Sequence, residues 1–141
     1  TIPPGVVLQG VNGQVYYNAT ATIPNVNTLS QLTLKAASTS PLLSPNDTGY
    51  ANLATAVKIF DLAINCNGIG LGSASNTGAG INIPDQGSSI SRFWTLERVY
   101  IYNGGTATHG FAMYIGQNNG AVTMRDCILF NGTSGTPWGK A

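Results

Sequence analysis

The stretch Val57-Lys-Ile-Phe-Asp-Leu-Ala-Ile64 decides the fold, because two later stretches repeat its pattern. They are Trp94-Thr-Leu-Glu-Arg-Val-Tyr-Ile101 and Val122-Thr-Met-Arg-Asp-Cys-Ile-Leu129. In each, apolar residues occupy the first, third, sixth and eighth positions, which is a two-residue strand period interrupted by one extra residue. The extra residue predicts a corner after which the apolar face points inward again. The repeats start 37 and 28 residues apart, spacings typical of stacked solenoid folds.

We therefore predict an all-β solenoid that forms a single domain over residues 1–141. Residues 1–56 are expected to form irregular entry coils with a long loop, and residues 57–141 about three regular coils. The predicted inward side chains are Val57, Ile59, Leu62 and Ile64, then Trp94, Leu96, Val99 and Ile101, and then Val122, Met124, Cys127 and Leu129.

Asn-Gly pairs at 67–68, 103–104 and 131–132 close the three units almost in register. Asn-Gly is a strong turn signal because both residues tolerate a positive φ angle. A meander of hairpins is the alternative, and it requires alternating strands on both sides of each pair. Polar stretches such as 68–78 follow instead, so the pattern favours parallel coils.

Three stretches resemble motifs of the right-handed parallel β-helices of the pectate-lyase-like superfamily. Thr1-Ile-Pro-Pro-Gly-Val-Val-Leu-Gln-Gly10 resembles the opening of these helices, and Lys58-Ile-Phe-Asp-Leu-Ala-Ile-Asn-Cys-Asn-Gly68 resembles one coil. Leu96-Glu-Arg-Val-Tyr-Ile-Tyr-Asn103 resembles another, with Arg98 where the superfamily frequently has Asn. The resemblance implies a right-handed parallel β-helix. It does not choose a function, because the superfamily includes pectate lyases, polygalacturonases, phage tailspikes and non-enzymatic surface proteins.

Charged residues are few: six basic and five acidic, for a net charge of +1. A protein that binds a phosphate backbone needs a basic stripe, so the composition excludes a nucleic-acid partner. No apolar run approaches the roughly 18 to 20 residues that cross a bilayer, which predicts no membrane span. Two cysteines and one histidine also give no familiar metal site, and we expect no cofactor. Cys66 and Cys127 are expected to be free thiols.

Most of the acids are expected to serve the corner rather than catalysis. The fifth repeat positions give the alternating series Asp61, Arg98 and Asp126, and the fourth positions place Glu97 beside Arg125. Opposite charges on neighbouring strands stabilise each other by about 0.2–1 kcal/mol. These pairs leave Asp47 and Asp85 as the remaining acids, and Asp47 fits an Asx turn within Pro45-Asn-Asp-Thr-Gly49.

Asp85 and His109 are the remaining catalytic candidates. Asp85 follows a predicted strand on the face that lyases and hydrolases of the superfamily use. His109 lies in Thr108-His-Gly-Phe-Ala-Met-Tyr-Ile-Gly116, which resembles a polygalacturonase segment whose histidine neighbours the catalytic acids. The accompanying Asp-Asp, Asn-x-Asp and Arg-Ile-Lys segments are missing, so a loop or sugar-contacting role for His109 is favoured. Enzymatic activity stays open, and its absence is favoured.

Outward positions of the second strand in each unit form an aromatic column of Tyr100, Tyr102 and Phe130. Exposed aromatic faces suit either contact with another subunit or stacking on sugar rings. Cover by loops of the same chain is the third interpretation. Three sequons, at Asn18, Asn46 and Asn131, are candidates for N-glycosylation, although their number is what chance predicts for this composition.

The sequence therefore favours a non-catalytic extracellular or virion-surface module, with a tailspike-like or fibre-like structural or adhesion role and an option of glycan contact. A polysaccharide lyase or glycoside hydrolase acting on acidic polysaccharides is the alternative. Three coils would rise only about 15 Å at about 4.8 Å per strand, and their two ends would be bare sheet edges. We therefore expect either further coils of a longer chain or self-association, with Tyr102 at a side-by-side contact.

Overall fold

The computed structural model describes residues 1–11, 30–46, 54–68, 78–84, 91–104, 111–117 and 120–130. These residues contain strands and no helix, so the predicted all-β class is confirmed. The strands are β1 (Val7–Gln9), β2 (Ser30–Thr33), β3 (Ala54–Asn65), β4 (Gly78–Ile83), β5 (Ser91–Tyr102), β6 (Phe111–Ile115), β7 (Ala121–Arg125) and β8 (Ile128–Phe130).

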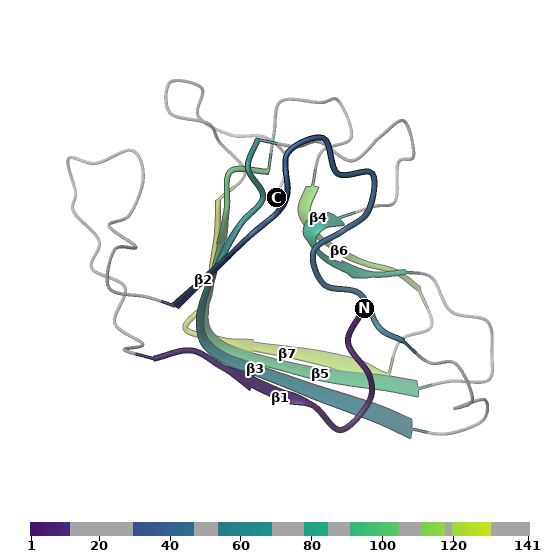
Figure 1. Cartoon of the computed structure of the whole chain (residues 1–141). Helices are drawn as coiled ribbons and strands as arrows, with labels where there is room; N and C mark the ends of the chain where they lie inside the picture. Colours follow the sequence, from purple (N-terminus) through teal and green to yellow (C-terminus); the bar gives the residue numbers. More distant parts are fainter. Residues whose placement is uncertain are drawn as a thin grey trace.

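All strand pairs in the described part are parallel. Six strands form one sheet in the order β1-β3-β5-β7, in which β2 also pairs with β3 and β8 also pairs with β5. The other two, β4 and β6, form a second sheet. In Figure 1 the large sheet is bent into two walls, and β4 and β6 lie across the interior from the bend.

The three repeats lie side by side with their equivalent positions aligned. Three columns of paired residues cross them: Val57, Trp94 and Val122; Ile59, Leu96 and Met124; and Ile64, Ile101 and Leu129. The predicted parallel, in-register pairing is therefore confirmed. Parallel strands joined in this way need long crossover connections rather than tight hairpins, which agrees with the polar stretches between the repeats.

The entry part of the chain joins the same sheet. Strand β1 pairs with the first half of β3, and β2 pairs with its second half, both in parallel. The stretch expected as a long loop also contributes to the side of the interior that β4 and β6 form, because Leu43 bridges to Ile81 of β4, and Pro45 bridges to Ile2. Strand β3 begins at Ala54, earlier than the repeat pattern alone indicates.

The interior is a single apolar core between the walls. Burial alternates along β3 as far as Ile59, as expected for a strand with one inward face. The core contains Ile2, Leu34, Val57, Ile59, Leu62, Ile64, Cys66, Ala79, Ile81, Ile83, Trp94, Leu96, Val99, Ile101 and Ala112. Burying a side chain of Val, Leu or Ile size contributes about 1.5–3 kcal/mol, so these aligned columns are the main source of stability.

The predicted inward side chains of the last repeat are less buried than those of the first two. Val122 and Cys127 are half-buried, whereas Met124 is 36% exposed and Leu129 is 38% exposed. Their alignment is as predicted, but β7 and β8 pair with β5 alone among the described strands. Among the described strands this layer lies at one end of the stack, where the sequence analysis expects a sheet edge.

Replacing an inward residue should destabilise the chain far more than replacing its outward neighbour. Ile59 is fully buried and Lys58 is exposed on the same strand. We expect Ile59→Ala to lower the free energy of unfolding by about 2–5 kcal/mol because it leaves a cavity. Lys58→Ala should change it by less than about 0.5 kcal/mol. Urea unfolding followed by circular dichroism measures both, and equal effects would contradict the assigned faces.

Candidate functional site

The corner of the large sheet is built by one column of residues. Asp61, Arg98 and Asp126 have φ angles of 54°, 52° and 52°, in the left-handed region. Gly10 occupies the same position after β1, where its N–H donates to the carbonyl oxygen of Phe60 over 3.0 Å. A Cβ atom on Gly10 would lie 2.0 Å from the Asp61 carbonyl oxygen, so only glycine fits at this position.

Left-handed backbone at the corner explains the extra residue in each repeat. Asp visits this conformation readily, whereas for most other L-residues it costs roughly 1–2 kcal/mol. Arg98 therefore adopts an unfavourable backbone angle in the middle of β5. Its side chain makes the contacts that offset this cost.

Arg98 is the centre of an ion cluster on the corner. Its Nε lies 2.5 Å from Asp61 Oδ1 and its Nη2 lies 3.2 Å from Oδ2, a two-point contact between guanidinium and carboxylate. Its Nη1 donates to Oε1 of the neighbouring Glu97. Gln9 Nε2 donates to Asp61 Oδ2 over 3.4 Å from the preceding strand. The predicted pairing of opposite charges at the corner is confirmed for Asp61 and Arg98.

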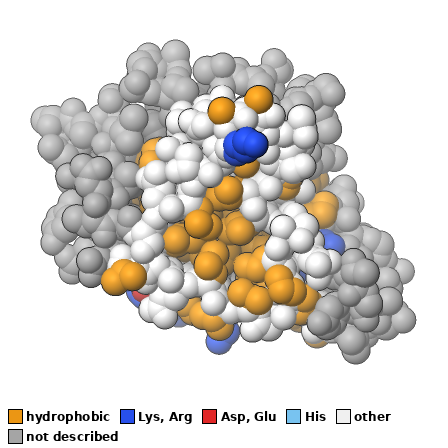
Figure 2. All heavy atoms as spheres, viewed as in Figure 1, with side chains coloured by type: hydrophobic (Ala, Val, Ile, Leu, Met, Phe, Trp, Pro, Cys, Tyr) orange, Lys and Arg blue, Asp and Glu red, His pale blue; other side chains and the backbone are white. Residues whose placement is uncertain are grey.

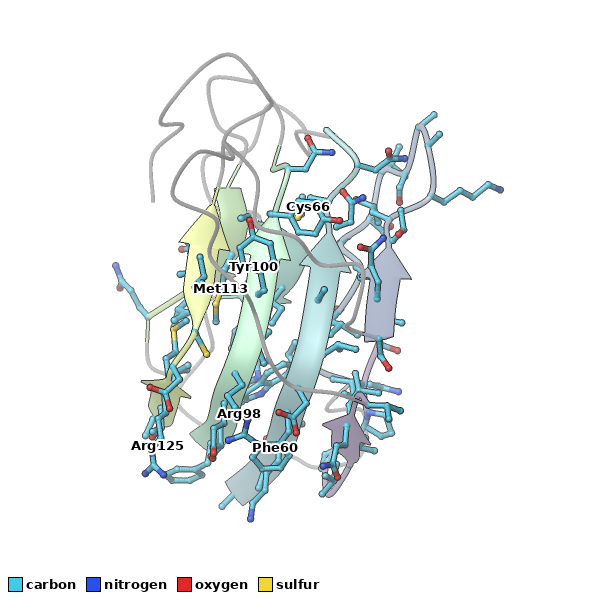
Figure 3. The ribbon with its side chains drawn as sticks, turned by 90° about the vertical axis from the view of Figure 1, so that its left-hand side faces the viewer. Phe60, Cys66, Arg98, Tyr100, Met113 and Arg125 are labelled. Carbon is cyan, nitrogen blue, oxygen red and sulfur yellow. The ribbon has the colours of Figure 1, made fainter. Side chains whose placement is uncertain are left out.

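Glu97 and Arg125 are aligned on β5 and β7, as expected from the repeats. The ion pair that Glu97 makes is nevertheless with Arg98. One guanidinium thus binds two of the chain's five carboxylates. Figure 3 shows the labelled Arg98, Arg125 and Phe60 at the same end of the wall that faces the viewer.

The cluster fixes the ionisation of both partners. The hydrogen bond from Arg98 is the main cause that lowers the pKa of the Asp61 carboxyl below its ordinary value of 3.8. The charge of Arg98 and the hydrogen bond from Gln9 act in the same direction, and burial opposes them. The hydrogen bonds to Asp61 and then to Glu97 raise the pKa of Arg98. A carboxyl that stays ionised in this way is a poor proton donor, so the corner is suited to holding the strands together.

Tyr100 and Tyr102 form a stacked pair on the outer side of β5. Their ring centroids are 5.0 Å apart and their planes differ by 11°. The hydroxyl of Tyr102 donates to Gln31 Oε1 over 2.6 Å. Gln31 lies on β2, and the intervening β3 carries the small Ala63 at the position aligned with both Gln31 and Tyr100. Burial is the main cause that raises the pKa of Tyr102.

The prediction of an exposed aromatic column is wrong for both tyrosines, because Tyr100 is 0% exposed and Tyr102 is 7% exposed. The strand period correctly places them opposite Val99 and Ile101, but the chain itself covers this side of the sheet as well. The interpretation that the same chain covers them is the one observed. Phe130 is aligned with Tyr102 on the next strand, and its side chain lies outside the described part.

Asparagine side chains order the end of the second wall. Asn65 Oδ1 accepts the N–H of Asn67 over 2.8 Å and the Nδ2–H of Asn103 over 3.2 Å. Asn67 and Asn103 have φ angles of 57° and 60°, as expected for the predicted Asn-Gly turns. The N–H of Gly68 donates to the Asn103 carbonyl oxygen over 2.8 Å. Besides turning the chain, the Asn-Gly pairs therefore join neighbouring layers by hydrogen bonds, which their spacing alone did not predict.

Arg92 is a buried residue that the sequence analysis missed. It is 4% exposed, and its Nη1 donates to the Pro84 carbonyl oxygen over 2.9 Å. It is aligned with Thr55, which is 3% exposed. The sequence could have predicted this burial, because the two-residue alternation of inward side chains extends backward from Val57 to Thr55 and from Trp94 to Arg92.

The two cysteines are free thiols, as predicted. Cys66 is fully buried, and burial raises the pKa of its thiol to about 12. Cys127 is half-buried, and its Sγ lies 3.4 Å from the Leu96 carbonyl oxygen and 3.3 Å from that of Arg125. Burial is the main cause that raises the pKa of this thiol too. Thiols that stay protonated at neutral pH are poor nucleophiles.

Several predicted site residues lie outside the described part of the chain: Asp85, His109, Asn18 and Asn131. The third sequon asparagine, Asn46, is described and exposed, and its backbone N–H donates to the Ile2 carbonyl oxygen over 2.9 Å. Within the described residues no group of three or more His, Cys, Asp or Glu side chains could hold a metal ion.

No helix in the described ranges is long and apolar enough to span a membrane. No protein-family model matches the chain, and neither does any curated protein or solved structure. The residues themselves therefore carry the functional argument.

Neutralising Asp61 should weaken the acid dependence of stability. The unfolded chain protonates this carboxyl near its ordinary pKa of 3.8, whereas the folded chain keeps it ionised to lower pH. Its contribution is therefore fully present above pH 3.8 and is lost as the pH falls through the folded pKa. Asparagine also tolerates a positive φ, so the Asp61→Asn variant should keep the corner. We expect this variant to bind up to about one proton fewer than the wild type when it unfolds in acid. Urea titrations at several pH values below neutrality give this number, and unchanged proton uptake would contradict the ion pair.

Two substitutions of Tyr102 should differ strongly in their effect. Tyr102→Phe removes only the hydrogen bond to Gln31, and we expect a loss of about 1 kcal/mol of unfolding free energy. Tyr102→Asp buries an unpaired carboxylate in place of a stacked ring, and we expect a loss of at least about 3 kcal/mol. Thr123→Asp, at an exposed position, is the control for an added charge. Wild-type stability of the Tyr102→Asp variant would mean that the ring is a surface group.

Proposed function

We propose that the chain is a right-handed parallel β-helix and that it serves as a non-catalytic structural module on an extracellular or virion surface, comparable in role to a tailspike or fibre segment. The observation that carries the proposal is the parallel, in-register alignment of four successive layers, from β1 through β3 and β5 to β7. Stacked layers of this kind make a stiff rod whose length grows with each turn.

The course of the chain supports the winding. From β3 it passes the corner at Asp61, returns by way of β4, and enters β5 beside β3, so that each circuit adds one layer. In Figure 1 the chain runs clockwise around the interior, and Figure 3 places β1 and β7 at opposite sides of the wall. A clockwise path that recedes from β1 to β7 is right-handed, which is the usual hand of parallel crossovers.

The chemistry of the described residues supports a structural role. Asp61 and Glu97 are bound by Arg98, and Asp126 belongs to the same corner column. Glycosidases need two carboxyl groups that flank the scissile bond, one of them able to donate a proton. The Asp61 carboxyl, whose pKa the hydrogen bond from Arg98 lowers, is unsuited to donating this proton. The buried tyrosine pair offers no stacking surface for a sugar, so the proposal does not include glycan contact through Tyr100 and Tyr102.

The low charge and the Ser-, Thr- and Asn-rich composition support an exported location. Surfaces of this composition rely on neutral polar groups for solubility, and the exposed Asn46 lies in a sequon. The resemblance of the stretches 1–10, 58–68 and 96–103 to the pectate-lyase-like superfamily supports the same class of proteins.

The proposal predicts that the chain has no activity on polysaccharides. The protein would be incubated with pectate, polygalacturonate, alginate and neutral glucans, with and without calcium, and assayed for new reducing ends and for unsaturated products. We expect neither product above the level of a heat-denatured control. Product formation that is reproducible and is abolished by Asp85→Asn or His109→Ala would overturn the proposal in favour of a lyase or hydrolase.

A further inference from the structure

Among the described strands, those at the two ends of the stack are paired along one edge only. In the described part of the chain, β1 and β2 pair only with β3, and β7 and β8 pair only with β5. The outer edge of each of these four strands therefore faces away from the sheet. Such an edge is a template for a further strand.

The apolar core also reaches the surface at both ends. At the β7–β8 end Met124 is 36% exposed and Leu129 is 38% exposed, although residues of the same columns in β3 and β5 are fully buried. At the β1–β2 end Val6, Leu8 and Leu32 are only partly buried. Figure 2 looks onto the end that carries β1, and apolar side chains gather at its centre.

The two ends match each other column by column. Leu8 is aligned with Ile59, whose column continues through Leu96 to Met124. Leu32 is aligned with Ile64, whose column continues through Ile101 to Leu129. A second copy placed with its β1–β2 layer one strand spacing beyond the β7–β8 layer would thus put apolar residues over apolar residues and strand edge against strand edge.

The charges favour this head-to-tail arrangement over a symmetric one. In a head-to-tail junction the corner residue Asp126 meets Gly10 of the next copy, and Arg125 meets Gln9, so no like charges are opposed. If two β7–β8 ends met with their corners aligned, Asp126 would face the same residue of the second copy. Like charges directly opposite each other on neighbouring strands are destabilising.

We propose that copies of this chain stack head to tail, with β1 and β2 of one copy added in parallel to β7 and β8 of another. The contact is heterologous, so it leaves one free end of each kind and continues into an open filament rather than a closed dimer. This inference rests on the proposed β-helix. Side-by-side contact through the tyrosines, the other route considered, has lost its basis because those rings are buried within the chain.

Sedimentation velocity over about a hundredfold range of protein concentration tests the stacking. We expect the mass to rise with concentration in steps of the 14.6 kDa chain and to continue beyond the dimer. Met124→Lys puts a charge on the junction at a residue that is already exposed, and it should weaken association at least tenfold. Thr123→Lys puts the same charge on the outward side of the same strand and should leave association unchanged.

A cysteine pair tests the register of the junction. Ser30 is aligned with Leu62, and Leu62 with Val99, and Cys127 continues this column at the other end of the stack. Aligned residues on neighbouring strands lie about 4.8 Å apart, within the Cα range of a disulfide, whereas three strand spacings within one chain exceed it at about 14 Å. Ser30→Cys should therefore link to Cys127 of a neighbouring copy when oxidised glutathione is supplied as the oxidant, giving a reducible ladder of covalent oligomers.

Each result has a distinct meaning. A folded chain, with strand-type circular dichroism, that stays monomeric and forms no ladder would overturn the stacking and leave the proposed β-helix intact. Growth that stops at a dimer, or equal effects of the two lysine substitutions, would also overturn it. A chain without strand-type circular dichroism would overturn the β-helix and the stacking together.

Discussion

The left-handed corner residue is the constraint on which the rest of this structure depends. A strand that bends without losing register needs one residue whose backbone departs from the extended form, and here the same position does so in each repeat, at Asp61, Arg98 and Asp126. Because every layer bends at the same point, the backbone ladder continues across the corner. The side chains before and after the bend can then both face one interior.

The corner also links backbone geometry to electrostatics. The left-handed backbone conformation is tolerated by Asp61 but is energetically unfavourable for Arg98. The contacts of the Arg98 guanidinium with two carboxylates offset this conformational energy. The Asp61 carboxyl, whose pKa the contact with Arg98 lowers, is a poor proton donor. The same ion pair joins the neighbouring strands β3 and β5 at the corner.

Much of the fold could be predicted from the sequence, because the period of apolar residues is a direct consequence of which face is buried. The columns that contain Ile59 and Leu96 follow from that period alone. The sequence could not decide whether Tyr100 and Tyr102 are exposed or covered, because alternation distinguishes the two faces of a strand and says nothing about what packs on the outer one. The same period, extended two residues backward, would have identified Arg92 as buried.

The candidate site was less predictable than the fold. The pairing of Asp61 with Arg98 could be predicted from their aligned positions. The ion pair of Glu97 is with its sequence neighbour Arg98 rather than with Arg125, because the long arginine side chain lets one guanidinium reach two carboxylates at once. Asp85 and His109 were singled out by local motif, and they fall outside the described residues. Local motifs fix which groups are present, whereas their chemistry depends on neighbours that only the folded chain brings together.

Nuclear Overhauser contacts between backbone protons of the repeats would distinguish a parallel stack from a meander of hairpins. For the parallel stack we expect contacts of Ile59 with the neighbours of Leu96, and of Leu96 with those of Met124, in the alignment of the three repeats. Close Hα–Hα contacts of antiparallel pairs, between the strands that flank each Asn-Gly turn, would instead indicate a meander of hairpins and would contradict the parallel stack.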